Sequence, residues 1–160
     1  MPVVRRRPPN VLVRSHLRRA GLVRVALARL ARRVLTAAGE PEAQLSLLLV
    51  GDRRMRRLNR LYRGRDYPTD VLAFPMREAG GPASPLLGDV VIALPQAARQ
   101  AKQDGHFLDQ ELATLLIHGT LHLLGYDHER GGREAERMRR KERAILQSVM
   151  PLPKLIARSK

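Results

Sequence analysis

The sequence predicts one domain of the α/β (α+β) class, in which a mixed sheet of about four strands packs with about five helices. The chain has 160 residues, of which 44% are hydrophobic, and this is enough for one compact domain with a substantial core. Segments typical of strands alternate along the chain with segments of helical periodicity, and no internal repeat stands out. Such an order favours helices layered on a single sheet, for which about four strands suffice.

The first three elements are expected to be a strand, a helix and a second strand. Residues 5–16 open with a proline-rich break and then alternate valine and leucine with polar residues, which favours a short strand. Residues 22–39 carry apolar residues near helical spacing and reach Gly39 just before Pro41, a typical helix end. The apolar run at 43–51 predicts a buried strand.

A short basic helix and two strands are expected next. The helix covers 52–64, where Asp52 is predicted to be the N-cap and apolar residues recur on one face. Residues 69–75 predict a strand after a turn. Residues 86–94 predict a further strand after the glycine- and proline-rich loop at 79–85.

Three helices complete the predicted domain. Residues 95–105 begin with Pro95, which suits the first turn of a helix. The strongest helical pattern lies at 108–125, and another helix is expected over 132–150.

These elements predict a single domain over 1–150 and a loose C-terminal tail at 151–160. No run of about 18 uncharged apolar residues occurs. The arginine-rich N-terminus is not followed by the apolar region and cleavage site of a secretory signal. We therefore expect a cytoplasmic protein.

Positive charge is the dominant global property, with 30 Lys+Arg against 15 Asp+Glu and a net charge of +15. Residues 1–39 hold ten arginines and no acid, and 129–160 hold ten basic and four acidic residues. Excess positive charge gives sequence-independent affinity for phosphates, so nucleic acid is the expected partner. No amphipathic anchor with Trp or Phe accompanies the charge, which argues against a membrane. A solvated basic surface is the alternative interpretation.

Three of the five histidines fall in the stretch HGTLHLLGYDH, which begins at His118. His118 and His122 are four residues apart on a predicted helix, so their side chains project from one face on successive turns. Gly125 can adopt the left-handed conformation that ends the helix, after which the chain can turn back and bring His128 alongside. The spacing predicts a metal site of three histidines at the end of this central helix.

The absence of cysteine restricts the ligands of any metal to His, Asp and Glu. Three imidazoles leave one of the four preferred positions of zinc open, which is typical of a catalytic site. One Zn²⁺ per chain is the expected cofactor, although other late first-row metals accept the same ligands.

The positions of His118, His122, Gly125 and His128 also match the spacing of metzincin proteases. In those enzymes the residue after the first histidine is a glutamate that acts as general base, and here that residue is Gly119. Loss of such a base removes about 10²–10⁴-fold of rate, so peptide hydrolysis becomes the less favoured alternative.

Cleavage of a phosphodiester suits the charge of the chain better and needs cations beside the phosphate. Arg63 lies between the basic helix and the next strand, where its guanidinium could reach a phosphate, or it could simply be an arginine favoured at a helix C-terminus. Asp127 is expected either to orient an imidazole or, as we favour, to cap the turn. Glu136, Met138 and Glu142 are interpreted as surface and packing positions of the last helix.

Three motifs together resemble the YbeY family of bacterial metal-dependent endoribonucleases, which mature small-subunit ribosomal RNA. They are HGTLHLLGYDH, LNRLYRGRDYPTDVLAFP (58–75) and LGDVVIAL (87–94), and EAERMRRKERAIL (134–146) extends the match. Ala73 stands where the family has the serine of DVLSFP, and the family's GDIVIS is here GDVVIA. Residues 1–39 carry little resemblance, so they are either an additional RNA or ribosome contact or only surface.

The resemblance implies a zinc ion held by His118, His122 and His128, with Arg63 as the important arginine of the cleft. It also implies a single-strand-specific endoribonuclease, a hydrolase of phosphodiester bonds, that acts in 16S rRNA 3′ end maturation, ribosome assembly and ribosome quality control. The expected partners are single-stranded RNA, 16S rRNA, the ribosome and its assembly proteins, and neither a membrane nor DNA is expected.

Two alternatives remain at this point: a zinc metallopeptidase, and a non-catalytic ribosome- or RNA-binding module with a structural metal. Because the chain has only two Phe and three Tyr for base stacking, we expect weak intrinsic sequence preference for RNA.

Overall fold

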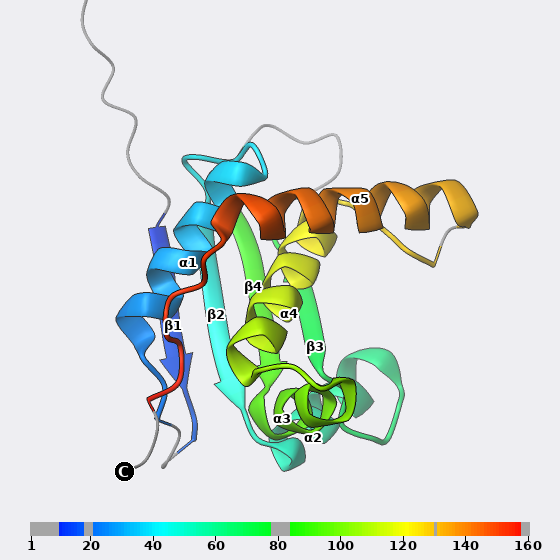
Figure 1. Ribbon diagram of the computed structural model, residues 1–160. Coiled ribbons are helices and arrows are strands. Elements are labelled where there is room, and N and C mark those ends of the chain that lie inside the picture. Colours follow the sequence, from blue (N-terminus) through cyan, green and yellow to red (C-terminus); the bar gives the residue numbers. More distant parts are fainter. Residues whose placement is uncertain (1–9, 18–20, 78–83, 130, 158–160) are drawn as a thin grey trace, which may run out of the picture.

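The computed structural model describes residues 10–17, 21–77, 84–129 and 131–157. Within these ranges one sheet packs with five helices, as expected (Figure 1). The strands are β1 (Asn10–Ser15), β2 (Gln44–Val50), β3 (Val71–Pro75) and β4 (Leu86–Ala93). The helices are α1 (Arg24–Ala37), α2 (Asp52–Arg63), α3 (Leu94–Asp104), α4 (Leu108–Leu123) and α5 (Gly132–Val149).

The sheet has the strand order β1-β2-β4-β3 and is mixed. β1 and β2 run parallel, as do β2 and β4, whereas β3 is antiparallel to β4 and forms one edge. The parallel pair β1 and β2 is joined by α1, which is the usual connection for parallel neighbours. The predicted mixed sheet of four strands is therefore confirmed.

One face of the sheet is covered by α1 and α4, and α5 lies across α4 (Figure 1). Alternate residues of β2 point into this side, where Leu45, Leu47 and Leu49 are buried. α4 touches the sheet, α1, α3 and α5, and ten of its sixteen residues are buried. A helix enclosed on so many sides gives the residues at its end a rigid support.

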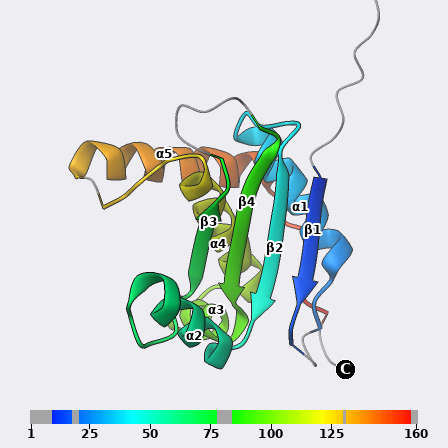
Figure 2. The ribbon, with the colours of Figure 1, turned by 180° about the vertical axis from the view of Figure 1, so that it is seen from behind.

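The opposite face is covered only at one end, where α2 packs against it (Figure 2). Met55 of α2 is buried there in a small second core with Leu72, Val91 and neighbouring residues. The remainder of this face carries no helix in the described part of the chain.

Gly119 lets α4 approach the sheet closely. A Cβ atom at this position would lie 2.8 Å from Cγ1 of Val90 in β4 and 3.3 Å from Cγ2 of Val71 in β3. Because both valines are β-branched and stiff, neither can easily move away. The distance between α4 and the sheet therefore depends on a residue without a side chain.

Two local expectations were wrong. Gly51, not Asp52, is the N-cap of α2, and the Asp52 carboxylate instead accepts hydrogen bonds of 2.8 Å from Nη2 of Arg99. Residues 151–157 are not loose, because Leu155 is fully buried and its carbonyl accepts a hydrogen bond of 2.8 Å from the Val23 N–H.

The boundary at residue 150 between the domain and the C-terminal segment at 151–160 stays a prediction. Residues 5–9 of the first expected strand lie outside the described residues. Among the described helices, none is long and apolar enough to cross a membrane.

Candidate metal centre and its cleft

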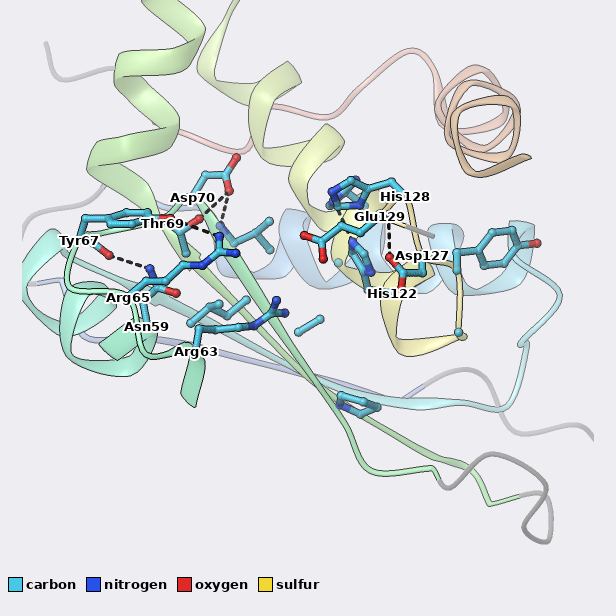
Figure 3. Close-up of a pocket in the computed structure, with 18 residues that line it drawn as sticks. Asn59, Arg63, Arg65, Tyr67, Thr69, Asp70, His122, Asp127, His128 and Glu129 are labelled. Carbon is cyan, nitrogen blue, oxygen red and sulfur yellow. Dashed lines mark hydrogen bonds between the residues drawn. The ribbon is translucent and has the colours of Figure 1, made fainter. Parts of the chain in front are cut away.

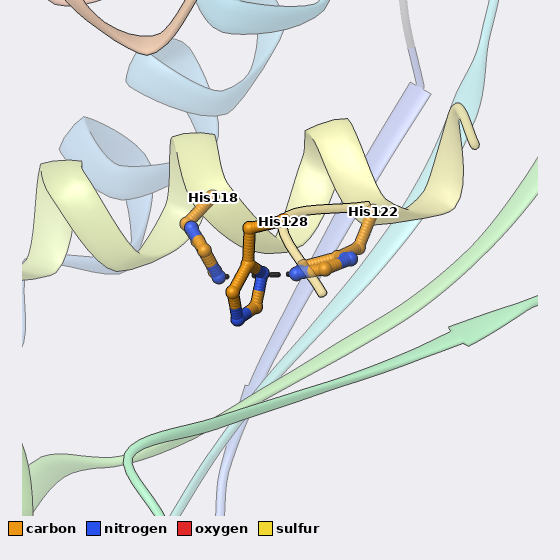
Figure 4. A group of neighbouring side chains, drawn as sticks. All are labelled: His118, His122 and His128. Atoms are coloured by element: carbon orange, nitrogen blue, oxygen red, sulfur yellow. Dashed lines mark hydrogen bonds between the residues drawn. The ribbon is translucent and has the colours of Figure 1, made fainter. Parts of the chain in front are cut away.

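Three histidines converge at the C-terminal end of α4 (Figure 4). His118 and His122 project from one face of the helix, and His128 reaches them from the segment that follows. One ring nitrogen from each lies within 4.8 Å of the others. The ring centroids are 4.6 Å apart for His118 and His122, and 5.2 and 5.1 Å from each of these to His128.

A tight turn after α4 brings His128 back. Gly125 has a φ of +93°, in the left-handed region, and the N–H of Tyr126 donates to the Leu121 carbonyl at 3.0 Å. Oδ1 of Asp127 then accepts a hydrogen bond of 2.8 Å from the N–H of Glu129. Asp127 therefore caps the turn, as we favoured, and Gly125 plays the expected role.

The donor set and its spacing fit a metal ion. Nε2 of His118 and Nε2 of His122 are 3.1 Å apart. Two nitrogens bound to one tetrahedral zinc at about 2.0–2.1 Å are separated by about 3.3–3.4 Å, so only a small adjustment is needed. The three imidazoles can hold a metal, but their geometry alone does not choose zinc over other late first-row ions.

The carboxylate of Glu142 in α5 fixes the orientation of His118. Nδ1 of His118 lies 2.6 Å from Oε1 of Glu142, and the two side chains are only 27% and 24% exposed. An ionised carboxylate can only accept, so Nδ1 carries the proton and donates it. The lone pair then lies on Nε2, the nitrogen that faces His122.

The environment of His122 lowers the pKa of this imidazole from its ordinary value. Burial is the largest cause, followed by the charges of His118 and His128, while Asp127 raises the pKa and Arg63 lowers it. A lowered pKa keeps the ring neutral near neutral pH, and only a neutral imidazole offers a lone pair to a metal.

The histidines stand at one side of a cleft of about 600 Å³ (Figure 3). Arg63, the last residue of α2, lines the same cleft and is exposed. Gly64 ends the helix after it with a φ of +67°. Within the described residues no hydrogen bond or ion pair holds the Arg63 guanidinium. The three histidines and Arg63 were expected in one site, and the structure brings all four together.

The wall of the cleft between α2 and β3 was not found from the sequence. Nδ2 of the buried Asn59 donates to the Tyr67 carbonyl at 2.8 Å, and Nη1 of Arg65 donates to the Tyr67 hydroxyl at 3.2 Å. These bonds order the loop that carries Arg65 and Tyr67 along the cleft.

Glu142 was interpreted as a surface or packing position, and this interpretation was wrong. A signal for its role was present in the sequence. Glu142 follows Met138 by four residues and precedes Ile145 by three, so it belongs to the stripe of α5 that holds these two buried residues. A carboxylate on a buried stripe needs a partner, and here the partner is His118.

Gly119 also bears on the metzincin alternative. A Cβ atom at this position would collide with Cγ1 of Val90 and crowd Cγ2 of Val71 in the sheet. The glutamate base of those proteases therefore has no place at this point of the structure.

Comparisons with known proteins agree with this arrangement. A family model described as Endoribonuclease YbeY matches residues 17–150. The chain is 57% identical to the Endoribonuclease YbeY of Anaeromyxobacter sp. (strain Fw109-5) over 108 residues, which cover 68% of this chain and 55% of that protein. The chain thus spans about half the length of that relative.

Two further proteins match this chain over a larger share of both sequences. The Endoribonuclease YbeY of Pelotomaculum thermopropionicum is 53% identical over 125 residues, which cover 75% of this chain and 82% of that protein. The solution structure of TM1509 from Thermotoga maritima superposes with a TM-score of 0.61 and 25% identity, over 87% of this chain and 88% of that one.

Proposed function

The chain belongs to the YbeY family of endoribonucleases, and from this premise we propose that it cleaves single-stranded RNA internally by metal-dependent hydrolysis. The observation that carries the proposal is the convergence of three histidines and the Arg63 guanidinium in one cleft. Nothing in the site or the comparisons favours a peptidase or a non-catalytic module.

In this proposal His118, His122 and His128 hold one Zn²⁺, and Glu142 keeps His118 oriented for it. Zinc bound there would acidify a water molecule or polarise an oxygen of the scissile phosphate. The short turn after α4 and the packing of α4 against the sheet keep the three imidazoles in place.

Arg63 is proposed to bind the scissile phosphate and to neutralise the charge that develops on it during cleavage. Its position supports this role because its guanidinium faces the cleft and no carboxylate of the described residues pairs with it. Arg65 and Tyr67 on the same wall supply a second cation and a ring for neighbouring nucleotides.

We place this activity in 16S rRNA 3′ end maturation, ribosome assembly and ribosome quality control, and therefore in the cytoplasm. The net charge of +15 supports RNA and the ribosome as partners, because it gives affinity for phosphates independent of sequence.

The deciding experiment is cleavage of a single-stranded fragment of the rRNA 3′ end by four samples. These are the wild type, His122→Ala, chelator-treated protein, and chelator-treated protein resupplied with zinc. Loss of cleavage in the second and third samples and its return in the fourth is expected. Equal cleavage by all four would overturn the proposal, because the activity would then come from a contaminant.

Arg63 is tested with a matched variant of the same helix. Arg63→Ala should lower the rate of cleavage about 100-fold, as loss of one well-placed donor to a developing charge does. Arg57→Ala removes the same charge from α2 outside the cleft and should leave the rate within about twofold. Equal losses in the two variants would reduce Arg63 to a contributor to net charge.

A further inference from the structure

A second hollow, here called the sheet groove, lies on the face of the sheet that α1 and α4 leave uncovered. Figure 2 views the sheet from this face. The groove has a volume of about 540 Å³. The strands form its floor, and one side of α2 forms its wall through Arg54, Leu58 and Tyr62, which recur every four residues.

The floor combines groups that suit a nucleobase. Ser46, Asp89 and Phe74 are direct neighbours across β2, β4 and β3, so a hydroxyl, a carboxylate and an aromatic ring stand side by side. They face the groove because the residues next to them, such as Leu47 and Val90, point into the main core. Within the described residues no hydrogen bond or ion pair engages the Asp89 carboxylate.

The rim of the groove is positively charged. Arg14 of β1 and Arg54 of α2 both line it, and both are exposed. In the described part of the chain neither guanidinium has a hydrogen bond or an ion pair. Two exposed arginines that line one hollow are complementary to an anionic backbone.

The few aromatic residues of the chain gather at the two hollows. Tyr67 and Tyr126 line the metal cleft, whereas Tyr62 and Phe74 line the sheet groove. The rings of Tyr62 and Phe74 meet edge to face, with centroids 5.0 Å apart, and Tyr62 is 61% exposed. Phe107 alone lies at neither hollow. A supported but exposed ring offers a surface on which a base can stack.

We infer that the sheet groove binds a nucleotide of the same RNA outside the cleft, with its base stacked on Tyr62 and its phosphates at Arg14 and Arg54. This inference rests on the proposed endoribonuclease function. Asp89 sets the orientation, since its negative charge keeps phosphates off the floor while it accepts hydrogen bonds from the amino group of a base.

The two hollows are separated by the end of α2 and by the edge strand β3. On α2, Arg63 faces the cleft and its neighbour Tyr62 faces the groove. On β3, Ala73 faces the cleft and Phe74 faces the groove. Among the described strands none lies beyond β3, so RNA bound in the cleft can pass around this edge, and only an RNA longer than the cleft engages both hollows.

The test compares the binding of two fluorescently labelled single-stranded RNAs of about 4 and about 16 nucleotides, measured by anisotropy on the chelator-treated full chain so that no cleavage occurs. Tyr62→Ala should weaken binding of the long RNA about tenfold and leave the short one unchanged. The matched control is Phe107→Ala, which removes a ring that is 75% exposed and should change neither affinity.

Arginine is tested in the same way. Arg14→Ala should weaken binding of the long RNA severalfold more than Arg133→Ala, which removes an equal charge from the start of α5. Thermal unfolding of each variant separates loss of binding from loss of fold. Long-RNA affinity equal to wild type in both Tyr62→Ala and Arg14→Ala would overturn the inference and leave the groove to a protein partner.

Crosslinking provides a second, direct measurement. Long RNA carrying 5-iodouridine should, on irradiation, become crosslinked to the peptide that contains Tyr62. If the RNA crosslinks to Tyr67 or Tyr126 in the cleft but not to the Tyr62 peptide, the inference is overturned. If the wild type neither binds nor cleaves either RNA, the proposed function itself fails. If the wild type is active and the groove variants bind like it, only the inference about the groove fails.

The role of Asp89 has its own readout. Oligocytidine should bind more tightly than oligouridine, whose base has no amino group, and Asp89→Ala should abolish the difference. Equal affinity of the wild type for the two homopolymers would overturn the placement of the base over Asp89.

Discussion

Replacing Glu142 by glutamine should weaken zinc binding about tenfold. The His118–Glu142 hydrogen bond is 2.6 Å long, and the two side chains are only 27% and 24% exposed, so solvent screens it in part. A hydrogen bond to a charged group contributes about 1.5–3 kcal/mol. Glutamine keeps a neutral acceptor and should lose about half of the upper value, or about 1.4 kcal/mol, which is a factor of ten in Kd. Glu142→Ala removes the acceptor altogether. It should weaken zinc binding by up to about 100-fold, or roughly 2.8 kcal/mol, which is the upper end of the effect of removing a hydrogen-bond partner of a metal ligand.

The assay is competition for zinc between the protein and a chromophoric chelator at constant pH and salt. Glu136→Gln is the matched control, because Glu136 lies on the same helix, is 46% exposed and pairs with Arg139 at 2.9 Å, away from the histidines. Its Kd for zinc should equal that of the wild type. A folded Glu142→Gln or Glu142→Ala variant with unchanged Kd would refute the argument that this carboxylate orients His118.

Three further outcomes follow from the structure. Gly119→Ala should lower the free energy of unfolding in urea by about 1–2 kcal/mol. Overpacking costs about 1–3 kcal/mol, and the higher helix propensity of alanine recovers up to about 1 kcal/mol of this. The effects of Gly119→Ala and Val90→Ala should be coupled in the double variant, and strict additivity would contradict the contact. Zinc at a hundredfold excess over its Kd should raise the free energy of unfolding by about 2.7 kcal/mol, seen as a higher Tm that His122→Ala does not show. Arg77→Ala should cost about 1 kcal/mol, because the partly buried Arg77 donates to both oxygens of Glu40 at 2.8 and 3.1 Å, and an unchanged urea midpoint would argue against this ion pair.

The order and type of the helices and strands could be predicted because each rests on local patterns. The periodic apolar residues of the sequence are those that the sheet and α4 bury in the structure. The predicted and observed bounds of the elements differ by only a few residues. The three histidines could be predicted for a similar reason. His118 and His122 are related by one helical turn, and His128 by a glycine turn, so no distant part of the chain was needed.

The parts that escaped prediction depend on distant contacts. Glu142 is 24 residues from His118 and meets it only because α5 crosses α4. The sheet groove depends on Tyr62 meeting Phe74, which requires that α2 pack on the far face of the sheet. The N-cap assignment of Asp52 was wrong because Asp52 is already the first residue of α2, and its carboxylate accepts hydrogen bonds from Arg99 of another helix.

The close packing at Gly119 also limits how the protein can evolve. One codon change separates many glycines from glutamate, and such a change would give the metzincin sequence pattern around the histidines. In this fold the new side chain would first collide with Val90 and Val71, pushing α4 outwards together with His118 and His122. In this fold the metzincin pattern is therefore opposed by the packing of α4 on the sheet rather than by the metal ligands, and an engineer who wants a glutamate at this position must first make room at Val90 in β4 and Val71 in β3.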